Sequence, residues 1–170
     1  MTFPFSIFAN GFRTLKFDLQ TAEQHAKSNN ISPDTLISAR LIDDMQPLAF
    51  QVLAVHNTVH KVLSRAKNIE PAVLDAGDKS FEDFYKRIDA ILAELDSTDL
   101  AALEGNKATT FKTPAGGREP VFTVEEYGVA FGVPNFFFHL VTAYDILRAQ
   151  GVPLGKKDYL GSFLDSVSEK

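Results

Sequence analysis

The stretch PNFFFHLVTAYDILRAQG, residues 134–151, decides the fold, because it predicts a long helix with hardly any polar side. A helix that is apolar nearly all the way round is typical of the inside of a helical bundle. Gly151 closes the segment, as glycine commonly does after the last helical turn. On a helical wheel His139 shares a sector with Ala143 and Ile146, so we expect its imidazole to point into the bundle.

Outward from this segment, three more stretches place apolar residues at spacings of three and four, which is the pattern of an amphipathic helix. They cover residues 6–28, 47–67 and 80–96. The proline that opens the second stretch and the serine–aspartate capping pair that opens the third both mark first helical turns. The segment ISPDTLISARL, residues 31–41, adds a short helix. Together with the apolar segment they predict an all-α fold, an up-and-down four-helix bundle.

One part of the chain departs from helical periodicity. Residues 109–113 alternate and are rich in β-branched side chains, PAGGRE supplies turn chemistry, and residues 121–123 could return as a second strand. We therefore expect a small β-hairpin or an extended loop before the last helix. Thr123 and Glu126 then form a capping box that starts a helix. That helix must kink or restart at Pro134, because proline lacks an amide donor and clashes with the preceding turn.

Length and composition limit the class of protein. The chain has 170 residues, 45% hydrophobic and 23% charged, so we expect one globular domain over residues 1–170. The net charge of −5 argues against a nucleic-acid partner, since phosphate binding needs a basic face. The lack of cysteine excludes disulfides, thiolate nucleophiles and cysteine-ligated metals. No apolar run could cross a bilayer and no signal peptide is evident, so we expect a cytoplasmic location and no membrane partner.

The histidines are the side chains whose ordinary pKa lies closest to neutrality. His25 lies off the apolar stripe and is interpreted as a surface residue. His56 and His60 stand four apart, so both imidazoles project from one side of their helix, and such a pair can bind a divalent cation if further ligands arrive. The spacing alone is a weak signal, because the HExxH zinc motif needs a glutamate where Asn57 stands. The plainer interpretation is one histidine at the core boundary and one in solvent.

His139 leaves two interpretations open. A buried imidazole must satisfy both ring nitrogens, so a structural hydrogen bond to a neighbouring group is the first. The second is a side chain that lines a cavity as a general base or ligand, with His56 and His60 across from it. Tyr127 and Tyr144 could supply hydrogen-bond donors nearby.

The order of the helices and two segments, SARLIDDMQPLAFQV (38–52) and PNFFFHLVTAYDILRAQGVPLGKKDYLG (134–161), resemble a branch of the DinB/YfiT-like superfamily. That branch is classed as a domain of unknown function, and the likeness covers nearly the whole chain. The resemblance implies a four-helix bundle of DinB type, often a homodimer, with a cavity between the helix over 47–67 and the last helix.

The resemblance also implies a metal site that has degenerated. Members of the superfamily commonly bind a divalent metal through three histidines, and some act as metal-dependent thiol transferases or isomerases. His139 matches the first histidine of the pair on the last helix, but the second position holds Ala143, which cannot coordinate a metal. Either His56 or His60 could stand near the remaining ligand position. A cavity without a metal is the expected outcome, and zinc or nickel bound by His56, His60 and His139 is the alternative.

Three functional hypotheses remain. The first is a bundle that binds a small apolar or aromatic molecule without a metal, as an isomerase, a cyclase or a plain carrier. In it His139 and Tyr144 would be catalytic, and His56, Phe136 and Tyr127 would bind the ligand. The second is a divalent-metal-dependent enzyme with a His56/His60/His139 site. The third is a non-catalytic structural dimer. The residues do not decide whether the protein catalyses a reaction.

Overall fold

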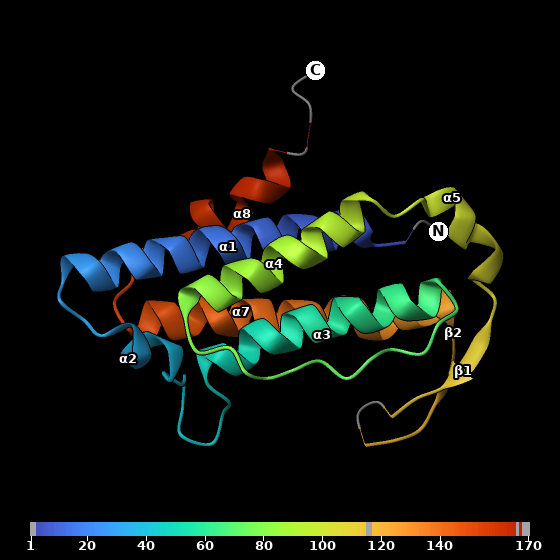
Figure 1. Ribbon diagram of the computed structural model, residues 1–170, viewed down its shortest axis with the longest axis horizontal. Coiled ribbons are helices and arrows are strands. Elements are labelled where there is room, and N and C mark those ends of the chain that lie inside the picture. The colour runs from blue at the N-terminus through green and yellow to red at the C-terminus, as the bar shows by residue number, and fades with distance from the viewer. Residues whose placement is uncertain (1–2, 115–116, 166, 168–170) are drawn as a thin grey trace.

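Four long helices build the molecule, as Figure 1 shows for the computed structural model, which describes residues 3–114, 117–165 and 167. They are α1 (Phe5–Ser28), α3 (Leu48–Ala66), α4 (Phe81–Asp96) and α7 (Val133–Ala149). Each lies close to the boundaries that its apolar periodicity predicts. The predicted all-α bundle with a short extra helix and a small hairpin is confirmed.

Helices α3 and α4 run in the same direction, which refines the up-and-down description. His56 of α3 lies beside Arg87 of α4, and further along both helices Lys67 lies beside Glu94. Two consecutive helices can be parallel only if the chain first returns along the bundle. Residues 67–80 make that return as an extended crossover segment, visible in Figure 1 as the long green coil below α3.

The core is filled by phenylalanine and aliphatic side chains from all four long helices. Its largest fully buried members are Phe8, Phe12, Phe84, Phe136, Leu15, Leu19, Leu36, Leu48, Leu63, Ile88, Ile91 and Leu140. Helices α1 and α7 approach closely where Gly11 meets Phe136. A Cβ atom at Gly11 would clash with a ring carbon of Phe136, so only glycine fits there without a shift of the ring. The phenylalanine-rich segment is therefore held against α1 by shape as well as by burial.

The predicted hairpin is present. Strands β1 (Thr110–Lys112) and β2 (Val121–Thr123) pair antiparallel, with Phe111 opposite Phe122. The turn between them includes residues 115 and 116, which lie outside the described residues. Both aromatic rings of the pair pack edge-on against Tyr127, and this small sheet closes one end of the bundle.

The chain passes from the hairpin into α7 without a break. Thr123 and Glu126 form the predicted capping box at the start of α6 (Val124–Glu126), and a π-helical segment, η2 (Tyr127–Gly132), follows. Helix α7 then begins with Pro134 in its first turn, where no amide donor is needed. The wider π-helical turn is the irregularity before Pro134 that the sequence predicted as a kink or a restart of the helix.

Short elements complete the chain. Helix α2 (Pro33–Ile37) follows α1, and α5 (Leu100–Leu103) with the 3-10 turn η1 (Glu104–Asn106) leads to the hairpin. Helix α8 (Lys156–Leu164) packs on the outside of α1, as Figure 1 shows in red. The sequence predicted only a partly packed tail there, and residues 166 and 168–170 lie outside the described part. None of the helices that the structure describes is long and apolar enough to span a membrane.

Candidate functional site

His139 projects from α7 toward α3 and is half-buried at the seam between these two helices. Its Nδ1 lies 2.8 Å from Oε1 of Gln51, whose side chain is almost fully buried. The amide nitrogen of Gln51 donates to the carbonyl oxygen of Gln46 at 2.9 Å. Because that carbonyl can only accept, the amide orientation is fixed and its oxygen faces the imidazole.

This arrangement sets the tautomer of His139. The oxygen of Gln51 can only accept, so Nδ1 of the neutral ring carries the proton and Nε2 carries the lone pair. Burial lowers the pKa of His139 below its ordinary value, which favours the neutral ring at pH 7. The side chain can therefore act as a hydrogen-bond acceptor or as a proton acceptor at Nε2.

Two aromatic side chains flank the imidazole. The ring centroids of Phe50 and Phe138 lie 6.0 Å and 5.2 Å from that of His139, both in edge-on orientation. Phe50 is 41% exposed and Phe138 is 60% exposed, so the ring of His139 lies between two apolar surfaces open to solvent. Such a surface suits the apolar or aromatic part of a small molecule.

His56 faces α4 instead. Its Nδ1 lies 3.3 Å from a guanidinium nitrogen of Arg87, which also binds both carboxylate oxygens of Asp78 and the carbonyl oxygen of Asp75. Burial first, and then electrostatic interaction with Arg87 and His60, lower the pKa of His56 to about 4. Arg87 thus ties the crossover segment to both α3 and α4, and His56 is one of its hydrogen-bond partners.

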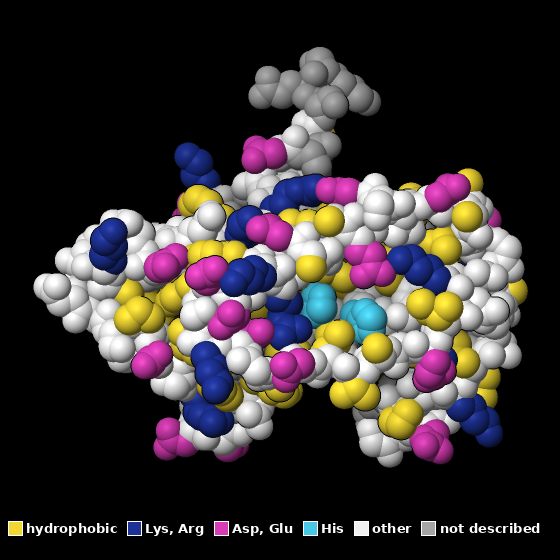
Figure 2. Space-filling view, in the orientation of Figure 1, with side chains coloured by type: hydrophobic (Ala, Val, Ile, Leu, Met, Phe, Trp, Pro, Cys, Tyr) yellow, Lys and Arg dark blue, Asp and Glu magenta, His cyan; other side chains and the backbone are white. Residues whose placement is uncertain are grey.

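His60 stacks with His56, with ring centroids 6.3 Å apart. Its Nε2 is buried and has no hydrogen-bond partner among the residues that the structure describes. Figure 2 shows histidine side chains together at the surface between α3 and α4, next to a basic side chain. His56 is half-buried, which fits the core-boundary position of the plain interpretation, whereas His60 is also half-buried and does not lie in open solvent.

The structure does not bring the three predicted metal ligands together. His56 and His60 lie on the α4 side of α3, whereas His139 meets Gln51 on the α7 side. Within residues 3–114, 117–165 and 167, no group of three or more histidine, aspartate or glutamate side chains could hold a metal ion. The cation of Arg87 beside His56 also opposes a second positive charge. Zinc or nickel bound by these histidines remains a prediction without geometric support.

The other predicted site residues lie in three separate places. Phe136 is completely buried in the core against Phe8 and Phe12. Tyr127 is buried in the aromatic cluster beneath the hairpin, and burial raises the pKa of its hydroxyl. Tyr144 turns toward α8, where its ring meets that of Tyr159. The single cavity expected to unite these side chains with His56 and His139 is not formed by them.

Tyr144 does line a groove between α7 and α8. This groove has a volume of about 200 Å³ and is lined by Val141, Tyr144, Asp145, Lys156 and Tyr159. Its walls are mostly apolar, with one acidic and one basic side chain at the rim. Tyr144 therefore has a place in a candidate binding groove, but a different one from that of His139.

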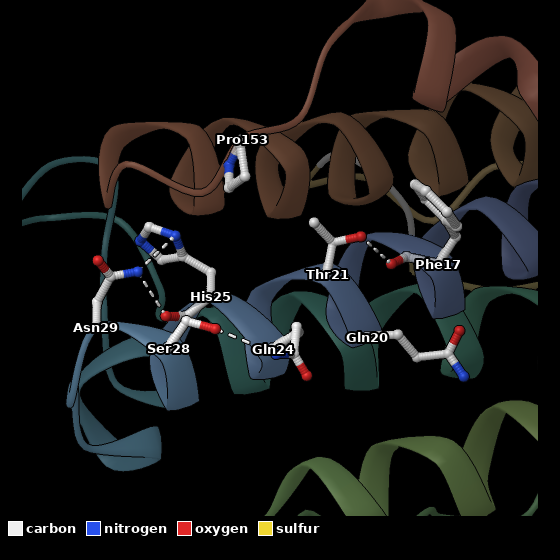
Figure 3. A pocket seen from close by; sticks show the side chains of 8 residues that line it. All are labelled: Phe17, Gln20, Thr21, Gln24, His25, Ser28, Asn29 and Pro153. Carbon is white, nitrogen blue, oxygen red and sulfur yellow. Dashed lines mark hydrogen bonds between the residues drawn. The ribbon is translucent and has the colours of Figure 1, made fainter.

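His25 is less exposed than its sequence position suggests. It lines an open depression of about 460 Å³ on the outer face of α1, where Figure 3 shows Pro153 lying over the side chains of His25 and Asn29. The polar side chains in this depression bond along their own helix, as Asn29 does to the carbonyl oxygen of His25 at 2.8 Å. This pattern is typical of a solvated helix face and does not converge on a ligand.

Gln51 is the site residue that the sequence did not single out. The signal for it is a polar side chain on the apolar face that also carries Val55 and Val62 at helical spacing. A polar residue on such a face usually has a buried partner. The sequence alone could not show that the partner is His139.

Comparisons with known proteins agree with the helical-bundle fold. A family model described as domain of unknown function DUF1993 matches residues 3–160. The chain is also similar to a crystal structure of a DinB family member protein from Shewanella denitrificans. That similarity has a TM-score of 0.81 and 28% sequence identity, and it covers 92% of this chain and 89% of that chain. A comparison with curated proteins gave no significant match.

Proposed function

The chain belongs to the DUF1993 family, a DinB-like family of unknown function, and on this premise we propose that it is a small-molecule-binding bundle with a degenerate metal site. In this proposal the neutral imidazole of His139 meets an apolar or aromatic compound at the seam between α3 and α7. No metal takes part. An isomerisation or a cyclisation that begins with proton removal is the reaction class that such a group supports best.

The observation that carries the proposal is the hydrogen bond between Gln51 and His139. A histidine that acts as a general base must be neutral, must point its lone pair at the ligand and must keep that orientation. Gln51 satisfies Nδ1 from within the protein, which leaves Nε2 for the ligand. A half-buried imidazole with a fixed tautomer is better suited to proton transfer than a freely rotating surface histidine.

Gln51 also determines what happens after proton transfer. When Nε2 takes a proton from an O–H or an acidic C–H of the ligand, the ring becomes an imidazolium and keeps its Nδ1 hydrogen bond to the amide oxygen. A neutral amide stabilises that cation less than a carboxylate would. The imidazolium therefore returns its proton readily, to the same or to another atom of the ligand. Such a reversible transfer is what an isomerase or a cyclase requires.

The aromatic flank supports the choice of ligand. Phe50 and Phe138 give the site two apolar walls, and the only polar atom that His139 offers there is Nε2. A planar apolar compound with one acidic proton fits both features. A metal would need further ligands beside His139, and Ala143 offers only a buried methyl group.

Binding of 4-nitrophenol, followed by its absorbance, tests the proposal. This probe has an aromatic ring and one acidic proton, so we expect saturable binding to the wild-type chain. His139→Ala should weaken binding at least tenfold, and Phe138→Ala should weaken it several-fold. His25→Ala is the matched control because its imidazole lies elsewhere, on the outer face of α1.

Two results would contradict the proposal. If His139→Ala binds the probe as tightly as the wild type, the imidazole is only a structural residue. If a chelator abolishes binding and added zinc restores it, the metal-dependent alternative takes its place. The homodimer that the resemblance implies and the cytoplasmic location expected from the sequence remain predictions, and light scattering decides the first.

A further inference from the structure

The contact between α1 and α8 contains an acidic side chain without a partner. Asp18 of α1 is completely buried, and neither of its carboxylate oxygens has a hydrogen-bond partner among the described residues. An ionised carboxylate in such a place has lost its hydration without compensation. The side chain is not used by the proposed site at His139, so it needs an explanation of its own.

The groups around Asp18 do not neutralise it. Asp158 of α8 acts on Asp18 as a like charge, and its own carboxylate accepts the amide of Gly155 at 2.8 Å to cap the start of α8. Burial first, and then Asp158, raise the pKa of Asp18 to about 7. Asp18 in turn acts on the hydroxyl of Tyr159, and the other titratable groups that line the groove between α7 and α8 are Lys156, Tyr144 and Asp145. The basic side chains Arg13 and Lys16 of α1 pair with acids of α4 instead.

Helix α8 lies on the outside of the bundle, where it packs on α1. None of its residues is fully buried. A hydrogen bond of 3.2 Å from the hydroxyl of Thr14 to the carbonyl oxygen of Tyr159 and aromatic contacts of Tyr159 and Phe163 attach it. The preceding connection is anchored, because Val152 and Leu154 are buried. A movement of α8 can therefore begin after Leu154 and leave the four long helices in place.

We propose that α8 is a proton-controlled cover, which docks on α1 when the carboxyl of Asp18 is protonated and is released when that carboxyl ionises. Protonation removes both the desolvation cost and the repulsion from Asp158. Release opens the groove of Val141, Tyr144 and Asp145, whose other wall is α8 itself. The aromatic surface beneath α8 then becomes accessible to ligands near and above neutral pH.

A single tryptophan tests this directly. The chain has no tryptophan, so Phe163→Trp places one reporter in α8, next to the ring of Phe137. We expect its fluorescence to change in one transition that begins near pH 7 as α8 leaves the aromatic surface. Adding Asp18→Asn, which imitates the protonated carboxyl, should keep α8 docked from pH 5 to pH 9 and abolish the transition.

A second measurement avoids any change that the introduced tryptophan causes in the packing of α8. Hydrogen exchange in the chain without tryptophan should show the protection of α8 amides falling about tenfold relative to α3 amides between pH 6 and pH 8. His25→Gln is the matched control, because it removes an imidazole that lies near the α7–α8 connection at Gly151. The proposal is overturned if Asp18→Asn keeps the transition, if His25→Gln removes it, or if α8 stays protected at pH 8.

Discussion

The α3–α7 seam and the α1–α8 contact bury polar groups in opposite ways. At the seam, Gln51 satisfies His139 and is itself satisfied by a backbone carbonyl, so every proton has a definite position. At the other contact, Asp18 is buried with no partner for either oxygen among the described residues. A satisfied polar pair gives a fixed arrangement, whereas an unsatisfied acid gives one that depends on pH. The first region is thus suited to positioning a ligand and the second to movement.

The largest effect is expected from the core that both regions share. Phe136→Ala should lower the free energy of unfolding by about 3–5 kcal/mol, because the ring is completely buried between α1 and α7. Phe138→Ala is the matched control two residues away, and its exposed ring should cost less than about 0.5 kcal/mol. Urea denaturation measures both. If Phe136→Ala loses little stability but binds 4-nitrophenol differently from the wild type, Phe136 belongs to the ligand site that the sequence predicted.

The ion pair between Arg87 and Asp78 is a third polar region, and it differs from the other two because opposite charges neutralise each other there. Arg87→Met should destabilise the fold by about 3 kcal/mol, since it leaves Asp78 buried without its cation. The pKa of His56 should rise in this variant because one of the groups that lowers it is removed. Arg13→Met, which breaks an exposed ion pair with Asp96, should change stability by less than about 1 kcal/mol. Equal losses in the two variants would show that the crossover segment is not held by Arg87.

The long helices could be predicted because the apolar residues that recur at helical spacing in the sequence are the residues that each helix buries. The stripe of Val52, Val55, Val59 and Val62 predicted from the sequence is the face that α3 buries. The direction of α4 could not be predicted, since it depends on the path of residues 67–80 and not on periodicity. The short helix α8 was missed because its partly buried face is too short to give a clear period.

The site could be predicted only in part, because a helical wheel places residues on one helix and not between helices. The helical wheel predicted that His139 faces the bundle, and the ring lies half-buried at the α3–α7 seam. The wheel could not show that His56 meets Arg87 between α3 and α4. The sequence around Asp18 also contains a signal of its burial. This residue follows Leu15 and precedes Leu19 and Ala22 on a face where every neighbour is buried. A charged residue at such a position in an apolar stripe predicts a shifted pKa, because burial there disfavours its charged form.

A smaller effect is expected at the unsatisfied acid. Asp18→Asn should stabilise the protein by about 1–2 kcal/mol at pH 8, where the wild-type carboxyl is ionised in the folded state. The sign follows from the pKa of about 7 in place of 3.8, which makes the folded state hold its proton longer than the unfolded chain. The contribution of a protonated Asp18 is complete below pH 4 and is lost as the pH rises through 7. Thermal unfolding from pH 4 to pH 9 measures it.

Asp145→Asn is the control for this variant, since Asp145 lies across the groove and should leave the pH dependence of stability unchanged. If Asp18→Asn is instead less stable than the wild type at every pH, the carboxylate has a favourable partner in solution. The difference between the two regions would then disappear.

The sharpest test of the seam is expected from Gln51→Glu. A carboxylate at this position should raise the pKa of His139, against the lowering that burial causes in the wild type, because it stabilises the imidazolium. Stability should fall by about 1–3 kcal/mol, because the almost fully buried carboxylate cannot donate to the carbonyl oxygen of Gln46 as the amide does. Nitrogen-15 NMR of the ring should show a proton on Nδ1 in the wild type and on both nitrogens in the variant near pH 7. A wild-type signal with the proton on Nε2 would remove the base from the proposed site, even if the hydrogen bond to Gln51 remained.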